Sequence, residues 1–150
     1  MSRPDVSCSI SLVSWGEAHE ALAAVRRAVF IFEQHVPESL EWDADDAVSL
    51  HALASTVAGE PIGAARLLPD GHIGRMSVLK EWRGKGVGGL LLQALLEQAR
   101  LRRHTRARLN AQTDAAGFYR RYGFEVEGPE FMEAGIAHVP MQRDLLSAPG

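Results

Sequence analysis

The sequence has a single cysteine and little that would tie the chain to an oxidising compartment, a membrane or a polyanion. Cys8 alone can form neither an intrachain disulfide nor a cysteine-based zinc cluster. The formal net charge is −3, so no overall positive field favours nucleic acid or anionic membranes. No apolar run approaches the roughly 20 residues that span a bilayer, and the start, with Asp5 and several serines, does not have the pattern of a signal peptide. We therefore expect a cytoplasmic protein with no nucleic-acid partner and no membrane partner.

Internal repeats, low-complexity tracts and a long Pro/Gly/Ser linker are also missing, so nothing divides the chain in two. Its 150 residues are 46% apolar and 23% charged, which is typical of a globular domain. A chain of this length buries about two thirds of the surface that its unfolded form exposes. We expect one domain over residues 1–150, with a core over residues 8–146.

Hydrophobic periodicity predicts seven strands and three helices. The strands are expected at Ser9–Ser14, Ser49–Val57, Ile62–Leu68, His72–Leu79, Ala107–Ala111, Phe124–Glu127 and Ala137–Leu145. The helices are expected at Glu17–Phe32, from a glycine-rich turn to about Arg103, and at Asp114–Tyr122. The buried stripe of the first helix would be Leu22, Val25, Val29 and Phe32. Pro37 should end that helix, and the acidic stretch Glu38–Asp46 has the pattern of a loop. The order of elements indicates an α/β fold with a mixed sheet.

The most specific feature is the segment Arg83-Gly84-Lys85-Gly86-Val87-Gly88-Gly89, between a predicted strand and the long predicted helix. Glycines remove the Cβ atoms that would keep a ligand from the backbone. The N–H groups of a first helical turn lack intrahelical partners, and the helix dipole adds positive charge there. Together they form a pyrophosphate cradle, to which Arg83 and Lys85 can add charge. The alternative is a flexible loop before an amphipathic helix.

The spacing Gly84-x-Gly86-x-x-Gly89 also satisfies the dinucleotide-binding fingerprint, but its context disagrees. That motif should follow the first strand of a βαβ unit almost directly, with an acidic residue about 20 positions later. Here it lies in the middle of the chain, and Asn110 stands near the acidic position. No Gly-Lys-Ser/Thr closes the segment, and no HExxH or CxxC occurs, so a nucleotide-hydrolysing loop and a metal site are not expected.

Two motifs resemble those of one superfamily. Residues 76–88 closely resemble the acetyl-CoA-binding motif of the GNAT superfamily, Arg/Gln-x-x-Gly-x-Gly/Ala after the fourth strand. About 35 residues later, the run from Ala115 to Phe124 resembles its second signature, Ala-x-x-Phe-Tyr-x-x-x-Gly-Phe. Arg27–Gln34, Glu41-Trp42-Asp43 and Gly135–Met141 are similar to the ElaA-like branch of small bacterial GNAT proteins.

This resemblance implies a mixed, mostly antiparallel central sheet flanked by helices, with a splayed strand pair that takes acetyl-CoA as co-substrate. Backbone groups of Met76 and Val78 would pair with the pantetheine arm, and amides of residues 83–89 would take the pyrophosphate. Asn110 would hydrogen-bond the pantetheine or be an ordinary strand-end residue. The implied cofactor-binding residues are Met76, Val78, Arg83, Gly84, Lys85, Gly86, Val87, Gly88, Gly89, Asn110, Phe118 and Tyr119.

Two residues carry the implied chemistry, direct transfer of acetyl from CoA to a primary amine. Tyr119 matches the tyrosine that protonates the departing thiolate, although it can instead pack beside Phe118 and bind CoA without proton transfer. Glu33 is the first candidate for the base that deprotonates the amine, through a water or with a raised pKa. Its alternative is a carboxylate that only orients a cationic acceptor.

The residues expected on the acceptor side are Glu33, Gln34, His72, Arg75 and His138. The two histidines are secondary candidates with a structural alternative, and for Arg75 an internal ion pair with Asp43 or Asp46 is favoured. The acceptor would be a small-molecule or peptide amine, and a homodimer is the expected assembly. A different class of function is an acyl-CoA-binding sensor that acetylates nothing.

Overall fold

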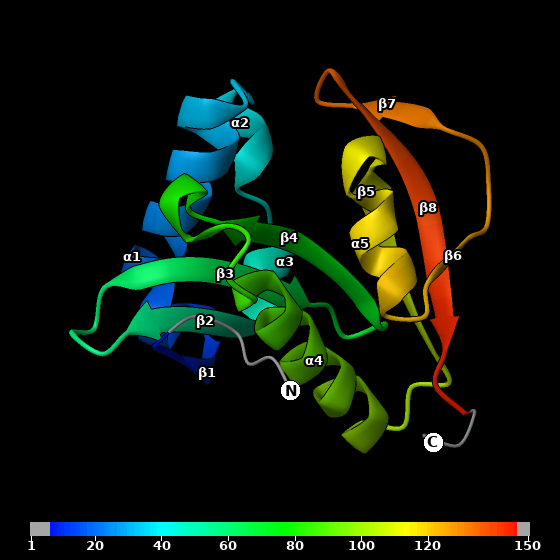
Figure 1. Cartoon of the computed structure of the whole chain (residues 1–150), viewed down its shortest axis with the longest axis horizontal. Helices are drawn as coiled ribbons and strands as arrows, with labels where there is room; N and C mark the ends of the chain where they lie inside the picture. Colours follow the sequence, from blue (N-terminus) through cyan, green and yellow to red (C-terminus); the bar gives the residue numbers. More distant parts are fainter. Residues whose placement is uncertain (1–6, 147–150) are drawn as a thin grey trace.

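Eight strands form one sheet in the computed structural model of the chain, which describes residues 7–146 (Figure 1). The strands are β1 (Cys8–Ser14), β2 (Leu50–Thr56), β3 (Pro61–Leu67), β4 (His72–Val78), β5 (Arg106–Gln112), β6 (Glu125–Val126), β7 (Phe131–Glu133) and β8 (Ile136–Asp144). The helices are α1 (Trp15–Arg26), η1 (Arg27–Glu33), α2 (Glu38–Glu41), α3 (Asp45–Val48), η2 (Lys80–Trp82), α4 (Val87–Leu101), η3 (Thr113–Ala115) and α5 (Ala116–Arg121). Every expected strand is present, and β7 is additional. Because the ends of the chain lie outside the described residues, one domain over 1–150 stays a prediction.

The sheet has the order β1-β2-β3-β4-β5-β8-β6, with β7 beside β8. All neighbours are antiparallel except β4 and β5, which run parallel and pair only at His72 with Arg108 and Ile73 with Leu109. Beyond Ile73 the two strands part, and the halves β1–β4 and β5–β8 diverge toward the top of Figure 1. The predicted mixed, mostly antiparallel sheet with a splayed pair is confirmed. A doubly wound parallel sheet, which a dinucleotide-binding domain requires, is excluded.

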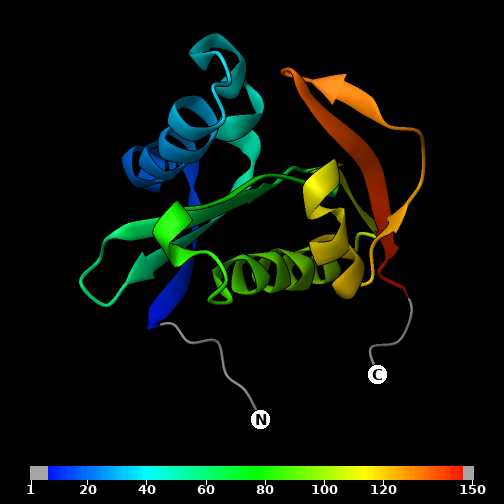
Figure 2. The ribbon, with the colours of Figure 1, turned by 45° about the horizontal axis from the view of Figure 1, so that its top comes forward.

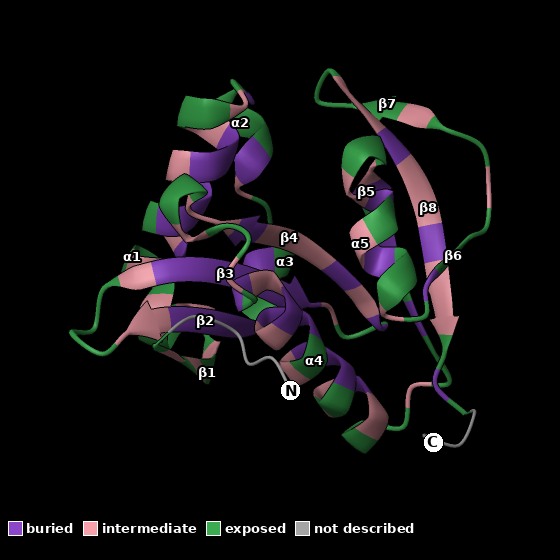
Figure 3. Cartoon of the chain, viewed as in Figure 1, coloured by how far each residue is buried: buried purple, intermediate pink, exposed green. Residues whose placement is uncertain are grey.

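Helices cover both faces of the sheet. Helix α4 lies along one face and α1 with η1 along the other (Figure 2). The buried leucines of α4 pack on β2 and β3 in the main core, whose buried positions Figure 3 marks. Helix and sheet approach closely at Gly63, where a Cβ atom would stand 3.0 Å from side-chain atoms of both Val87 and Leu91. The core therefore fixes the start of α4, and with it the glycine-rich turn, against β3.

The first helix departs from its predicted periodicity at its C-terminal end. Ser14 caps α1 in a capping box with Glu17, and from Arg27 to Glu33 the chain continues as the π-helix η1. Hydrogen bonds that reach five residues back advance the face of the helix. As a result Phe30 is buried and Phe32 is 69% exposed, so the predicted place of Phe32 in the buried stripe is wrong. The helix also ends at Glu33, before Pro37, which instead precedes α2.

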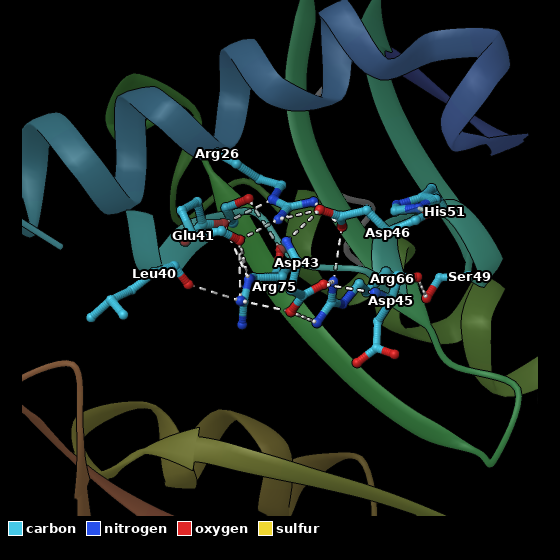
Figure 4. A network of polar contacts seen from close by, with 11 residues as sticks. Arg26, Leu40, Glu41, Asp43, Asp45, Asp46, Ser49, His51, Arg66 and Arg75 are labelled. Carbon is cyan, nitrogen blue, oxygen red and sulfur yellow. Dashed lines mark hydrogen bonds and ion pairs between the residues drawn. The ribbon is translucent and has the colours of Figure 1, made fainter. Parts of the chain in front are cut away.

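The acidic stretch 38–46 is not the solvated loop that its composition predicts. It holds the short helices α2 and α3, whose carboxylates meet three arginines from α1, β3 and β4 (Figure 4). Arg26, 1% exposed, pairs with Glu41 at 2.8 Å and with Asp46 at 2.6 Å. Arg66 pairs with Asp46 at 2.8 Å as well. These ion pairs hold the segment against the sheet, since each buried charge has an opposite charge in contact.

The environment shifts the pKa values of these carboxyl groups in both directions. Burial alone would raise the pKa of Asp46, but its bonds to Arg26 and Arg66 bring that pKa below the usual value. Burial raises the pKa of Glu41. Because the pKa of Asp46 is depressed on folding, its stabilising contribution is present above the unfolded value, about 3.9, and is lost as the pH falls.

Asp46→Asn should lower the free energy of unfolding by about 3–5 kcal/mol at neutral pH, because two buried arginines lose a shared partner. Urea denaturation measures this change. Asp45→Asn is the matched control, since this neighbouring carboxylate is exposed, and its effect should stay within about 0.5 kcal/mol. Equal effects of the two variants would contradict a stabilising role for the buried network.

Candidate active site

A cavity of about 1050 Å³ opens where β4 and β5 part. It is lined by the glycine-rich turn, by β4 and β5, by α5, and on the other side of the sheet by η1, α2 and the β7–β8 turn. Fifteen of the predicted site residues line it: Gln34, His72, Arg75, Met76, Val78, Arg83, Gly84, Gly86, Val87, Gly88, Gly89, Asn110, Phe118, Tyr119 and His138. Glu33 and Lys85 do not. One cavity therefore unites segments from four parts of the chain, residues 29–43, 66–89, 109–122 and 133–138.

The glycine-rich turn has the geometry of an anion cradle. Gly84 and Gly86 adopt φ of 76° and 93°, a left-handed conformation that side chains resist, and α4 begins directly after Gly86. The first hydrogen bond from within the helix back to the turn joins Leu90 N–H to the Gly86 carbonyl at 3.1 Å. The N–H groups of residues 87–89 precede that bond, so the helix itself leaves them open for a diphosphate.

The free edge of β4 presents backbone groups to the same cavity. The N–H of Leu79 donates a hydrogen bond to the Ile62 carbonyl, and Val78 lies opposite Gly63. In this register Val78 and Gly63 form a non-hydrogen-bonded pair, in which the N–H and C=O groups of each residue point away from the partner strand. Those of Val78 therefore face the gap beside β5. Its carbonyl accepts a bond from Arg83 Nε at 3.0 Å, which leaves the N–H for a ligand that lies along the strand.

Glu33 is held by Arg83 and does not face the cavity. Both carboxylate oxygens of Glu33 accept bonds of 2.6 Å from the Arg83 guanidinium. These bonds hold the pKa of Glu33 below its usual range, so the expectation of a raised pKa is wrong. Arg83 in turn has its three nitrogens engaged by Glu33 and Val78, so in this conformation its side chain is not directed at a phosphate. The pair ties the end of η1 to the cradle.

Tyr119 projects from α5 into the cavity and is almost fully buried. Its ring contacts Phe118 and Phe124 edge to face, and its hydroxyl has no hydrogen-bond partner among the described residues. Burial raises the pKa of Tyr119 to about 12, so the hydroxyl stays protonated. Complete transfer of its proton to a free thiolate, whose thiol pKa is about 8.5, would be uphill by about 5 kcal/mol. This hydroxyl is therefore suited to donate a hydrogen bond rather than to give up its proton.

A pair of amides bridges the two halves of the sheet above the gap. Gln34, at the end of η1, and Gln112, at the end of β5, exchange hydrogen bonds of 2.9 and 3.3 Å. Beside them Ile136 of β8 packs against Val29 and Phe30 of η1. The sequence did not single out Gln112, which lies in no recognised motif, or Ile136, which lies in the segment Gly135–Met141 but has an apolar side chain that signals no contact. The predicted acceptor residue Gln34 thus acts here as part of a bridge.

The remaining predicted residues differ in how they are held. Arg75, at φ 51° in a bulge of β4, pairs with Asp43 at 3.2 Å, so the favoured internal ion pair is confirmed. It also pairs with Glu41, and Figure 4 shows it at the lower edge of the charge network. His72 contacts Asp70 at 3.0 Å. Asn110 is exposed, and its side chain makes no hydrogen bond within residues 7–146.

Among residues 7–146, no three His, Cys, Asp or Glu side chains gather in a way that could hold a metal ion. Within the same range, no helix is long and apolar enough to cross a bilayer. The expectation that the protein needs no metal stays a prediction.

Comparisons with known proteins agree on one family. The family model of the GNAT acetyltransferase domain matches residues 16–145. YjcF of Bacillus subtilis (strain 168), named an uncharacterised N-acetyltransferase, is 39% identical over 124 residues, covering 80% of this chain and 88% of YjcF. An acyl-CoA N-acyltransferase from Pseudomonas aeruginosa has a TM-score of 0.81 and 31% identity, over 91% of this chain and 99% of that one. The structure of Escherichia coli ElaA has a TM-score of 0.81 and 28% identity, over 91% of this chain and 99% of ElaA, in line with the resemblance to the ElaA-like branch.

Gly84→Ala should weaken CoA binding at least about tenfold, because its Cβ would occupy the cradle as well as strain a left-handed residue. Gly59→Ala is a matched control, since both glycines have positive φ and open space around the missing Cβ. Each variant should lose about 1–2 kcal/mol of stability. Calorimetric titration with CoA distinguishes the two variants, because only Gly84→Ala should bind CoA more weakly. An unchanged CoA affinity in Gly84→Ala would contradict the cradle.

Proposed function

The chain belongs to the GNAT acetyltransferase family and is an enzyme that transfers acyl groups, and on that premise we propose that it moves acetyl from acetyl-CoA to a primary amine. Transfer is direct, in a ternary complex, with no covalent enzyme intermediate. The observation that carries the proposal is one cavity that joins the anion cradle, the free edge of β4 and the Tyr119 side chain. A thioester supplies an activated acyl carbon and a sulfur leaving group.

The residues present fit CoA along its length. The open amides of residues 87–89 suit the diphosphate, and the unpaired edge of β4 suits the amide-bearing arm. The Val78 N–H, which faces the gap, is suited to polarise the thioester carbonyl. A chain held at these two points extends toward Tyr119, whose hydroxyl then hydrogen-bonds the departing sulfur.

For an amine to react, the side of the cavity away from the glycine-rich turn must align the amine with the thioester and supply a group that accepts its proton. An alkylamine with a pKa of about 10.4 is only about 0.04% neutral at pH 7, a deficit of about 4.6 kcal/mol. Alignment of the amine and the thioester in the gap between β4 and β5 lowers the activation barrier, because it removes the entropy cost of bringing the two reactants together. Cytoplasmic location, a homodimer, and the absence of nucleic-acid and membrane partners stay predictions.

Tyr119→Phe should lower kcat by about 10- to 100-fold with little change in CoA affinity, because a hydrogen bond to a charged group contributes about 1.5–3 kcal/mol. The thiol released from acetyl-CoA measures turnover, and calorimetry measures affinity. Tyr122→Phe is the comparison. The Tyr122 hydroxyl packs where a Cβ at Gly89 would stand, so its loss should affect CoA affinity rather than kcat.

The other outcomes distinguish the alternatives. An undiminished kcat in Tyr119→Phe would mean that this ring only packs. CoA binding by the unaltered protein without transfer to any amine would favour the acyl-CoA sensor. A protein that binds neither CoA nor acetyl-CoA would refute the donor proposal itself.

A further inference from the structure

His138 lies on the acceptor side of the cavity in a fixed orientation. It is placed opposite Gln112 in the register of β5 and β8, and its neighbours Ala137 and Val139 point to the other face of the sheet. The side chain is only 7% exposed and its ring stacks on Phe131, with centroids 5.8 Å apart and planes 23° apart. It lines the same cavity as Tyr119. The stacking on Phe131 and the burial limit how far this ring can turn.

One hydrogen bond defines the protonation of the neutral imidazole. Nδ1 of His138 lies 2.7 Å from the Ile136 carbonyl oxygen. A carbonyl can only accept a hydrogen bond, so Nδ1 must carry the proton. In a neutral imidazole the other nitrogen, Nε2, is then a proton acceptor. Nε2 has no hydrogen-bond partner among residues 7–146, which leaves its lone pair for a ligand in the cavity.

We propose that His138 is the general base that takes the proton from the acceptor amine, a proposal that rests on the proposed function. The ammonium form of the acceptor gives one proton to Nε2 of His138, which passes it to solvent. The nitrogen of the acceptor, now a neutral amine, then bonds to the carbonyl carbon of the thioester, and the carbon–sulfur bond breaks. The sulfur keeps the electron pair of that bond and receives the second nitrogen proton, so an amide and a thiol are the products.

The other ionisable groups near the cavity are less suited to this role. Both oxygens of Glu33 are bound by Arg83, and Glu33 does not line the cavity. Glu41 and Asp43 are paired with arginines.

Two groups remain on the acceptor side. His72 contacts Asp70 at the start of β4, where β4 still pairs with β5. Glu133 lines the cavity but is exposed on the β7–β8 turn, where water solvates its charge. His138 alone combines a buried ring with a nitrogen free to accept a proton among these described groups.

A first test needs no substrate. In the unliganded, ¹⁵N-labelled protein, at a pH at which the imidazole is neutral, long-range ¹H–¹⁵N spectra should show the His138 ring proton on Nδ1, assigned by the signal that disappears in His138→Gln. A proton on Nε2 would overturn the proposal, because that nitrogen could then donate but not accept.

A second test uses acceptors of different basicity at pH 7. For an alkylamine, His138→Gln should lower kcat/KM by about 10²- to 10⁴-fold, the usual contribution of a general base. For an amine that is already neutral, such as an acid hydrazide, the loss should be less than about fivefold, since no proton need be removed before attack. CoA affinity, measured by calorimetry, should stay unchanged.

Glu133→Gln is the comparison variant, because Glu133 is an ionisable group that lines the same cavity but is exposed to solvent. It should affect the alkylamine and the hydrazide equally. Equal losses for both acceptors in His138→Gln would mean a structural role and would refute the base assignment while the proposed function stands. If the unaltered protein binds CoA yet transfers acetyl to neither acceptor, the proposed function fails, and the base assignment fails with it.

Discussion

The separation of β4 from β5 after two residue pairs is the constraint on which the rest of the structure depends. A strand that leaves its neighbour exposes a row of backbone donors and acceptors inside the protein, and such groups cost free energy unless something satisfies them. This chain satisfies part of the row with its own side chains, as Arg83 does at the Val78 carbonyl. The part that remains open is the part that a strand-like ligand can complete.

Holding such a gap open requires both halves of the sheet to be rigid and joined elsewhere. On one side the buried arginines and carboxylates anchor α2 and α3 to β3 and β4, and the Arg26 guanidinium contacts the faces of the Trp15 and Trp42 rings. On the other side β8 pairs with three strands. The Gln34–Gln112 bridge joins the halves without filling the gap. Acid should weaken the first anchor, since the lowered pKa of Asp46 links its ion pairs to pH.

The distribution of charge in the cavity follows from the same arrangement. Glu33 and Arg83 neutralise each other at the donor end, and the carboxylates of the acidic stretch are paired with arginines. The same cavity is lined by the protonated phenol of Tyr119 on α5 and by the imidazole of His138 on β8.

Much of the secondary structure of this protein could be predicted from its sequence, because it depends on local interactions. The strands, the leucine face of α4 and the glycine-rich turn follow from periodicity and from the dihedral freedom of glycine, and both act over a few residues. The motif at residues 115–124 indicated the placement of Tyr119 near that turn. Composition predicted a solvated loop for the acidic stretch 38–46, and this was wrong because composition cannot show that Arg26, Arg66 and Arg75 lie against it in the fold.

Only the tertiary structure decided which side chains satisfy one another. Glu33 and Arg83 are 50 residues apart in sequence, and Gln34 and Gln112 are 78 apart. The π-helical turn of η1 similarly depends on its packing, and it exchanges Phe32 for Phe30 in the core. A charged or amide group accepts any complementary partner that the fold brings within about 3 Å, so its identity alone does not determine its role. For that reason the sequence determined the glycine-rich turn before α4, and the fold decided that His138, rather than Glu33, lines the cavity.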